Sequence, residues 1–223
     1  MNLIDELRTH RLLAIVRGPD PAAALASVLT LAESGVALVE VSLTSADALG
    51  IIRSARVALG PDFALGAGTV LTVEDARAAA DAGAGFLVTP ALAPSVTEAG
   101  RLGLPVLAGA LTPTEAGRLG LPVLAGALTP TEVVQAASAG ATAVKLFPAS
   151  LGGPGYLGAL RDPFPDTAFV PVGGVDADSV RGYLDRGAVA VGVGSPLLGD
   201  AVRGGDLAAL RERAATFLAV VRS

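Results

Sequence analysis

Short apolar runs alternate with amphipathic stretches along the whole chain. The runs are rich in Val, Ile, Leu and Ala and lack a polar residue at every second position, which is typical of strands buried on both faces of a parallel sheet. The runs predicted as strands are Leu12–Arg17, Ala37–Leu43, Phe63–Val70, Gly85–Pro90, one of Pro105–Leu111 and Pro122–Leu128, Ala143–Pro148, Ala168–Gly173 and Ala188–Gly194. The stretches between them predict helices over Pro21–Ser34, Ala46–Leu59, Val73–Ala82, Pro94–Leu102, Thr131–Ala139, Tyr156–Arg161 and Ala177–Arg186.

This alternation predicts an α/β fold in which strands and helices follow one another. Eight such units fill the chain, so we expect a (β/α)8 TIM barrel forming a single domain over residues 1–223. The acidic, amphipathic first residues predict a short N-terminal helix before the barrel. A doubly wound open sheet is the alternative, and the barrel is favoured because its units occupy the full length.

One block of the sequence is duplicated. Residues 99–115 and 116–132 are the same seventeen residues, repeated without a change. Each copy contains a helix end, a strand and a helix start. Because barrel closure links the number of strands to their shear and tilt, we expect a ninth strand to be rejected. The repeat should therefore supply only one barrel strand, with the second copy favoured and the other copy forming a surface excursion.

Composition narrows the classes of function. The chain is 52% hydrophobic with a mean hydropathy of +0.60, yet no window holds 18 uninterrupted apolar residues, so no transmembrane helix or membrane partner is expected. The first residues also lack the pattern of a signal peptide. The absence of cysteine excludes thiolate metal sites and fits a cytoplasmic location, and a single histidine, His10, excludes a multi-histidine metal centre. A net charge of −5 without a basic cluster argues against nucleic-acid binding.

The only lysine of the chain, Lys145, lies in the middle of an apolar run, whereas the other fifteen of the sixteen basic residues are arginine. Arginine stays protonated, but a lysine in a low-dielectric site loses its proton and can form an imine with a carbonyl. A buried, unpaired ammonium is also costly. Lys145 is therefore a candidate catalytic amine. The alternative is a lysine whose side chain reaches solvent at the strand end.

Glu40 is the second charged residue inside an apolar run. Because side chains alternate along a strand, Leu38, Glu40 and Ser42 share one face, as do Ala143, Lys145 and Phe147. If both faces point into the barrel, one amine and one carboxyl share its interior, as imine chemistry with proton transfer requires. A buried structural ion pair is the alternative, although such pairs rarely improve stability.

Other polar residues and glycines stand at predicted strand ends, where barrel enzymes carry their chemistry. Arg17 and Thr69 end the first and third strands, and both are able to bind a substrate carboxylate. Glycines follow the seventh and eighth strands, each before a predicted helix N-terminus, which is the usual phosphate site of such barrels. The expected phosphate-binding residues are Gly173, Gly174, Gly194 and Ser195.

Together these residues resemble the 2-keto-3-deoxy-6-phosphogluconate (KDPG) and 4-hydroxy-2-oxoglutarate (KHG) aldolase family, the small pyruvate-forming class I aldolases. The resemblance covers nearly the whole chain outside the duplicated block. It rests on the ordered motifs Leu12–Arg17, Val39–Val41, Gly66–Val70, Val88–Pro90, Leu128–Glu132, Val144–Pro148, Pro171–Val175 and Gly192–Ser195.

The resemblance implies a role for each matching position. It makes Lys145 the Schiff-base residue and Glu40 the general acid and base. It places Arg17 and Thr69 beside the carboxylate of the substrate. The Thr-Pro after the fourth strand, which is Thr89 and Pro90 here, would pack near the imine. A homotrimer without metal or organic cofactor is implied as well, acting on a phosphorylated keto acid.

Two positions depart from the pattern of the family. Val172 stands where many phosphogluconate-specific members have threonine, which resembles the 6-phosphogalactonate aldolases, whose substrate has the opposite C4 configuration. Losing that hydroxyl removes a donor and relaxes selection at this carbon. Thr44 stands where some members have arginine, so carboxylate binding would depend more on Arg17. Val172, Thr44 and Phe147 are the expected specificity positions.

The resemblance implies cleavage of KDPG, of its galactonate epimer, or of both, to pyruvate and glyceraldehyde 3-phosphate. A 4-hydroxy-2-oxoglutarate aldolase is one alternative. Another phosphate-binding barrel, an isomerase or synthase, would share the glycine sites without needing the lysine. A barrel scaffold inactivated by the duplication is the non-enzyme alternative.

Overall fold

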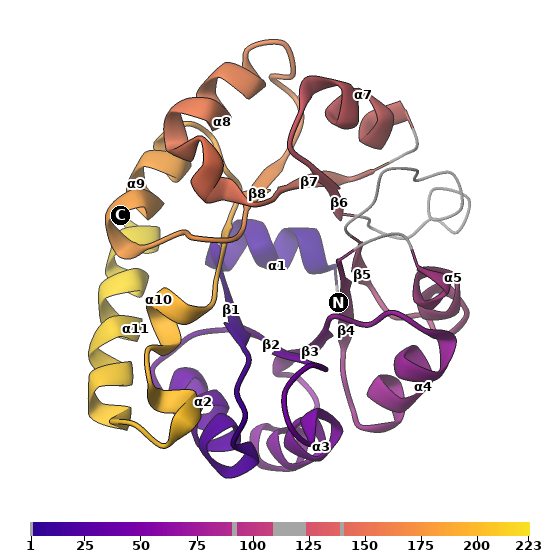
Figure 1. Ribbon diagram of the computed structural model, residues 1–223, viewed down its shortest axis with the longest axis vertical. Coiled ribbons are helices and arrows are strands. Elements are labelled where there is room, and N and C mark those ends of the chain that lie inside the picture. The colour runs from indigo at the N-terminus through magenta and orange to yellow at the C-terminus, as the bar shows by residue number, and fades with distance from the viewer. Residues whose placement is uncertain (1, 91–92, 109–123, 139–140) are drawn as a thin grey trace.

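The computed structural model describes residues 2–90, 93–108, 124–138 and 141–223, and its parallel strands form a ring surrounded by helices (Figure 1). The strands are β1 (Leu12–Val16), β2 (Leu38–Ser42), β3 (Ala64–Gly68), β4 (Phe86–Thr89), β5 (Val106–Ala108), β6 (Leu124–Ala127), β7 (Ala143–Leu146), β8 (Phe169–Pro171) and β9 (Val191–Val193). The α-helices are α1 (Leu3–His10), α2 (Pro21–Glu33), α3 (Ala48–Leu59), α4 (Val73–Asp81), α5 (Pro94–Arg101), α7 (Pro130–Ser138), α8 (Gly153–Arg161), α9 (Ala177–Asp185), α10 (Ser195–Leu198) and α11 (Leu207–Arg222). Short 3-10 turns η1 (Ala149–Leu151) and η2 (Ala201–Arg203) follow β7 and α10.

All paired strands are parallel and follow chain order around the ring. One hydrogen-bonded ladder has the order β5-β4-β3-β2-β1-β9 and a second has the order β6-β7-β8. An isolated parallel bridge between Val172 and Gly192 connects the two ladders where β8 ends. The predicted α/β barrel is therefore confirmed, and so is the short N-terminal helix. Within the described ranges, no helix combines the length and hydropathy needed to cross a bilayer.

Both copies of the duplicated block contribute a strand. The first copy supplies β5, which pairs with β4, and the second supplies β6, which pairs with β7. The prediction that only one copy enters the barrel is therefore wrong. The physical reason is that a short connection joins each strand to one neighbouring helix: α5 to β5 in the first copy and β6 to α7 in the second. Strand β5 of the first copy follows α5 and pairs with β4. Strand β6 of the second copy precedes α7 and pairs with β7.

Deleting residues 99–115 is expected to raise thermal stability. The deletion leaves one intact copy, and among the described residues β5 and β6 belong to separate ladders, so a single strand would be bonded at both edges. Unpaired strand edges and a longer connection both oppose stability. We expect the unfolding midpoint, measured by calorimetry, to rise by about 3 °C or more, the shift that about 1 kcal/mol produces in a domain of this size. A lower midpoint would show that the extra strand stabilises the barrel.

Side-chain alternation divides the apolar residues into two clusters. One lies between the strands and the outer helices and includes Val39, Val41, Val144 and Leu146. The other lies inside the ring and contains their chain neighbours Leu38 and Ala143, together with three buried residues of α1, namely Leu3, Ile4 and Leu7. Helix α1 thus fills the N-terminal end of the barrel, and it crosses the centre of the ring in Figure 1. Residues two positions along β2 and β7, at 40 and 145, face the same interior.

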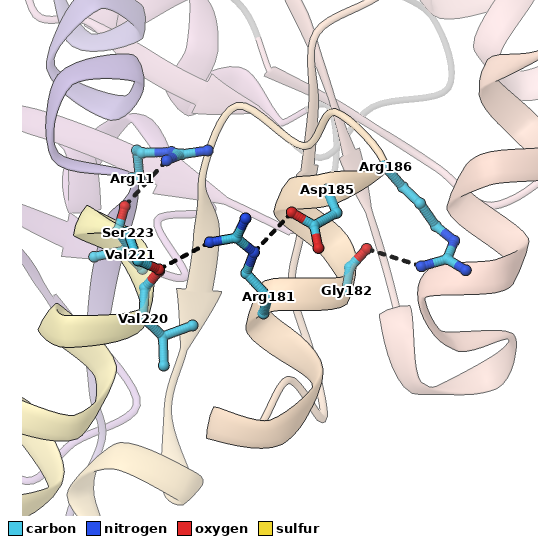
Figure 2. Close-up of polar contacts among 8 residues, drawn as sticks. All are labelled: Arg11, Arg181, Gly182, Asp185, Arg186, Val220, Val221 and Ser223. Atoms are coloured by element: carbon cyan, nitrogen blue, oxygen red, sulfur yellow. Dashed lines mark hydrogen bonds and ion pairs between the residues drawn. The ribbon is translucent and has the colours of Figure 1, made fainter.

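The C-terminal helix α11 closes the ring of helices, and the sequence prediction gave no bounds for it. Its apolar side packs on α2 and α9, with Leu210, Ala214 and Phe217 buried at helical spacing. Polar contacts hold its last turn (Figure 2). Arg11 donates from Nη1 to the Val221 carbonyl at 3.1 Å, and Arg181 of α9 donates from Nη1 to Ser223 Oγ at 2.9 Å.

Candidate active site

A cavity of about 1350 Å³ opens at the C-terminal ends of the strands. Its walls come from residues that end or directly follow most of the strands, including Arg17 after β1, Thr69 after β3 and Phe147 after β7. Because parallel strands end at the same edge, residues far apart in sequence meet there. Helix α1 fills the opposite end of the barrel, so the interior is open only at the C-terminal ends of the strands.

Lys145 lies on β7 and points into this cavity. Its Nζ lies 5.2 Å from the centre of the Phe147 ring, two residues along the same face, in a cation–π contact. Burial lowers the pKa of the Lys145 amine below its usual value, and the charge of Arg17 lowers it further, while the Glu40 carboxylate raises it. Burial is the largest of these effects, and it shifts the amine toward its neutral, nucleophilic form.

Glu40 lies on β2, is 5% exposed and lines the same cavity. Burial raises the pKa of its carboxyl from 4.5 to about 7, although Lys145 and Arg17 both lower it. Its Oε2 is buried without a hydrogen-bond partner among the described residues. A buried group that changes protonation near neutral pH and has a spare oxygen is suited to proton transfer.

Glycine is required opposite the Glu40 carboxyl. Gly68, which pairs with Ser42 across β3 and β2, leaves no room for a side chain, because a Cβ there would lie 2.6 Å from Glu40 Oε1. At Gly66, two residues earlier on the same face of β3, a Cβ would lie 2.2 Å from the Phe86 ring. The two glycines therefore leave room on the inward face of β3, and the Glu40 carboxyl and the Phe86 ring fill that room.

Polar side chains gather at the ends of β1, β2 and β3. Arg17 Nε donates to Ser42 Oγ at 3.3 Å. The same oxygen lies 2.8 Å from Thr44 Oγ1 and 2.9 Å from Thr69 Oγ1. Thr69 has φ of 61°, a left-handed conformation that is strained for a β-branched residue. Such strain is typical of positions held in place for a function.

The next part of the cavity wall is formed by the glycine-containing turns after β8 and β9, and β9 pairs directly with β1. Gly173 and Gly174 have φ of 89° and 74°, and Gly194 and Ser195 lie at the start of α10. All four line the cavity. Val172 precedes them, is 6% exposed and also lines it. A Cβ at Gly173 would lie 2.8 Å from the Phe147 ring, so the turn approaches the cation–π pair closely.

The structure brings together all but one of the predicted site residues. Thr89 is fully buried and does not line the cavity, because Val88 and Pro90 occupy the inward positions and Thr89 faces the helix layer with Leu87. Its predicted place beside the imine is therefore not supported.

Two residues escaped the sequence prediction as parts of the site. Ser42 is fully buried beneath the cavity, and the only signal for it was its place on the same face as Glu40. Arg203, at the end of η2, lines the cavity although no motif marks it. It is held there because Gly18 packs against Val202, where a Cβ would lie 2.6 Å from the Val202 carbonyl oxygen.

The fold is that of a barrel enzyme, and an amine and a carboxyl line its cavity. The chain belongs to the KDPG and KHG aldolase family, whose model matches residues 3–121 and 114–212, and members of this family are lyases. The two matched ranges break and overlap within the duplicated block.

Individual relatives agree with this assignment. The chain is 34% identical over 209 residues to the "probable 2-dehydro-3-deoxy-6-phosphogalactonate aldolase" of Rhizobium meliloti (strain 1021), covering 93% of this chain and 90% of that protein. It is 34% identical over 187 residues to the 2-dehydro-3-deoxy-6-phosphogalactonate aldolase of Escherichia coli (strain K12), covering 83% of each. A solved native KDPGal structure is similar with a TM-score of 0.75 and 32% identity, covering 95% of this chain and 94% of that one.

Proposed function

We propose that this protein is a class I aldolase that cleaves a 2-keto-3-deoxy-6-phospho sugar acid, the gluconate or galactonate epimer, into pyruvate and glyceraldehyde 3-phosphate. The observation that carries the proposal is the shared cavity of Lys145 and Glu40, in which burial shifts both groups toward their neutral forms. An amine for imine formation and a carboxyl that titrates near neutral pH are the two groups that this reaction needs.

Two groups of cavity residues suit the two charged groups of such a substrate. Arg17 and Thr69 are donors at one side and would hold the carboxylate. The turns containing Gly173, Gly174, Gly194 and Ser195 follow β8 and β9 and would bind the phosphate through backbone amides. Arg203 adds a positive charge to the wall of the same cavity.

The reaction begins when neutral Lys145 attacks the C2 carbonyl carbon. Protonated Glu40 gives its proton as the carbonyl oxygen leaves as water, which gives a protonated imine and leaves Glu40 ionised. Ionised Glu40 then takes the proton of the C4 hydroxyl, that oxygen becomes the aldehyde carbonyl, and the electrons of the C3–C4 bond move into an enamine. Glyceraldehyde 3-phosphate leaves. The protonated Glu40 returns its proton to C3, and water hydrolyses the remaining imine to pyruvate and free Lys145.

Relatives with the phosphogalactonate name favour the galactonate epimer as one substrate, and the family description keeps 4-hydroxy-2-oxoglutarate as the alternative. A homotrimeric assembly, a cytoplasmic location and a single domain over residues 1–223 stay predictions that rest on the family resemblance and on composition.

Replacing Val172 with threonine is expected to shift epimer preference toward the gluconate substrate. Val172 lines the cavity beside Gly173, so a hydroxyl there would offer a donor near C4. We expect the ratio of kcat/KM for the gluconate over the galactonate epimer to rise by about tenfold, as one hydrogen bond in a closed site permits. Val172→Ala changes volume without adding a hydroxyl and is the control. Equal shifts in both variants would assign the effect to shape.

Trapping with borohydride tests the proposed function directly. Incubating the protein with pyruvate and borohydride reduces the imine to a stable secondary amine, so a pyruvate-derived mass should appear on the peptide that contains Lys145. A reference aldolase trapped under the same conditions serves as the positive control. Absence of the adduct while the reference reacts would reject the proposed function.

A further inference from the structure

Ser42 lies at the centre of the polar cluster beneath the cavity. It ends β2, is fully buried and does not line the cavity itself. Its Oγ lies 3.3 Å from Arg17 Nε, 2.8 Å from Thr44 Oγ1 and 2.9 Å from Thr69 Oγ1. The Thr44 amide nitrogen lies 3.5 Å away, at the outer limit of a hydrogen bond. One buried hydroxyl therefore connects three side chains that do line the cavity.

The donors and acceptors of this cluster are limited. A serine hydroxyl has one hydrogen and two lone pairs, whereas a guanidinium has only donors. The bond from Arg17 Nε therefore occupies one lone pair of Ser42 Oγ. Ser42 is left with its single hydrogen for one threonine and one lone pair for the other. Two arrangements exist without a ligand: Ser42 donates to Thr69 and accepts from Thr44, or the reverse.

A bound carboxylate removes one of these arrangements. Carboxylate oxygens only accept, so a carboxylate against Thr69 requires Thr69 to donate to it. Thr69 must then accept from Ser42, and Ser42 must accept from Thr44. The chain of donors then runs from Thr44 through Ser42 and Thr69 to the ligand, while Arg17 uses Nε on Ser42 and keeps its terminal nitrogens for the same anion.

We propose that Ser42 is a positioning residue that orders the hydroxyls of Thr44 and Thr69 and orients Arg17, so that the site selects ketones that carry a carboxylate beside the carbonyl. This inference rests on the proposed function and adds the source of its preference for 2-keto acids. Ser42 also helps to hold Thr69 in its left-handed conformation, because the bond between the two hydroxyls joins the ends of β2 and β3.

The test compares two ketones of similar size, pyruvate and uncharged hydroxyacetone, by their half-saturating concentrations for borohydride trapping at Lys145. Ser42→Ala should raise the value for pyruvate about tenfold or more, because a charge-assisted contact is lost, and leave the value for hydroxyacetone within about twofold. Ser42→Thr keeps the hydroxyl and should restore the pyruvate value. Ser27→Ala is the matched control, since Ser27 is a fully buried serine of α2 whose Oγ donates to the Ala23 carbonyl away from the cavity.

The outcomes separate this inference from the proposed function. An unchanged ratio between the two ketones in Ser42→Ala, or an equal loss for both, would overturn the role of Ser42 while leaving the aldolase chemistry intact. If the wild type is trapped by neither ketone, the proposed function fails. Calorimetric titration with lactate, a carboxylate without a carbonyl, then still decides whether Ser42→Ala weakens carboxylate binding by about tenfold. Should Ser42→Ala not fold, Thr44→Val removes the first donor of the chain and should weaken pyruvate selectively by about threefold.

Discussion

Replacing Lys145 with arginine should abolish carbon–carbon cleavage. Arginine keeps a positive charge at this position, but it stays protonated and cannot form an imine. Removing a covalent nucleophile typically lowers kcat by roughly 10⁴-fold or more, so we expect turnover of either sugar-acid epimer to fall to background.

The same substitution separates catalysis from a structural ion pair. If Lys145 only balanced the charge of Glu40, Lys145→Arg would preserve that balance and turnover would persist. Measuring the aldehyde product in a coupled assay, with circular dichroism to verify folding, distinguishes the two. Turnover above a few per cent of wild type would contradict the assignment of Lys145.

Replacing Glu40 with glutamine should lower kcat by about 10²- to 10⁴-fold, the usual contribution of a positioned acid or base. Glutamine fills the same space beside Gly68 but neither accepts nor returns a proton. Imine formation also needs a proton, which water can supply more slowly than Glu40, so trapping of pyruvate on Lys145 should persist at a reduced rate. Loss of turnover together with retention of the adduct is the expected signature.

The same variant should be more stable at alkaline pH. The pKa of Glu40 rises from 4.5 to about 7 on folding, chiefly because of burial, so the folded protein binds the extra proton between these values. Wild-type stability therefore falls as pH rises from about 4.5 to 7, by on the order of 3 kcal/mol. Glutamine removes this penalty, so the gain should be full above pH 7 and vanish near pH 4, as measured by urea unfolding.

Glu98→Gln provides a control of opposite sign. Glu98 is also shielded, at 4% exposed, but it accepts from Arg77 at 2.8 Å and from Arg101 at 3.2 Å. The hydrogen bond from Arg77 is the main reason that the pKa of Glu98 is lowered. Its folded form thus prefers the charged state, and glutamine should destabilise the protein above the usual carboxyl pKa. Equal effects of the two substitutions would show that burial of Glu40 carries no penalty.

The sequence predicted the barrel and most of the site because both depend on local periodicity. Alternation along a strand put Glu40 on the same face as Leu38 and Lys145 on the same face as Ala143, and the structure places Leu38 and Ala143 in the interior cluster. The same rule, applied to Val88 and Pro90, would have directed Thr89 outward, where the structure has it.

The remaining differences come from long-range packing. Arg203 reaches the cavity only because η2 packs against Gly18, a contact across 184 residues of sequence that no motif marks, between positions 18 and 202. Ser42 lies on a predicted face, but its three partners come from separate strand ends. The strand count failed for a related reason: the two copies are identical, so only their different neighbours, α5 and α7, decide where each one pairs.

Helix α1 closes one end of the barrel, so the barrel interior opens at the other end only. Its residues Leu3, Ile4 and Leu7 fill the closed end. Substrate, water and both products would therefore pass through the same cavity opening, next to Lys145. In the proposed reaction the pyruvyl fragment would stay bound covalently to Lys145, whereas the phosphorylated fragment would not. Departure would then be sequential: the triose phosphate would leave first, and the three-carbon acid would follow only after hydrolysis of the imine.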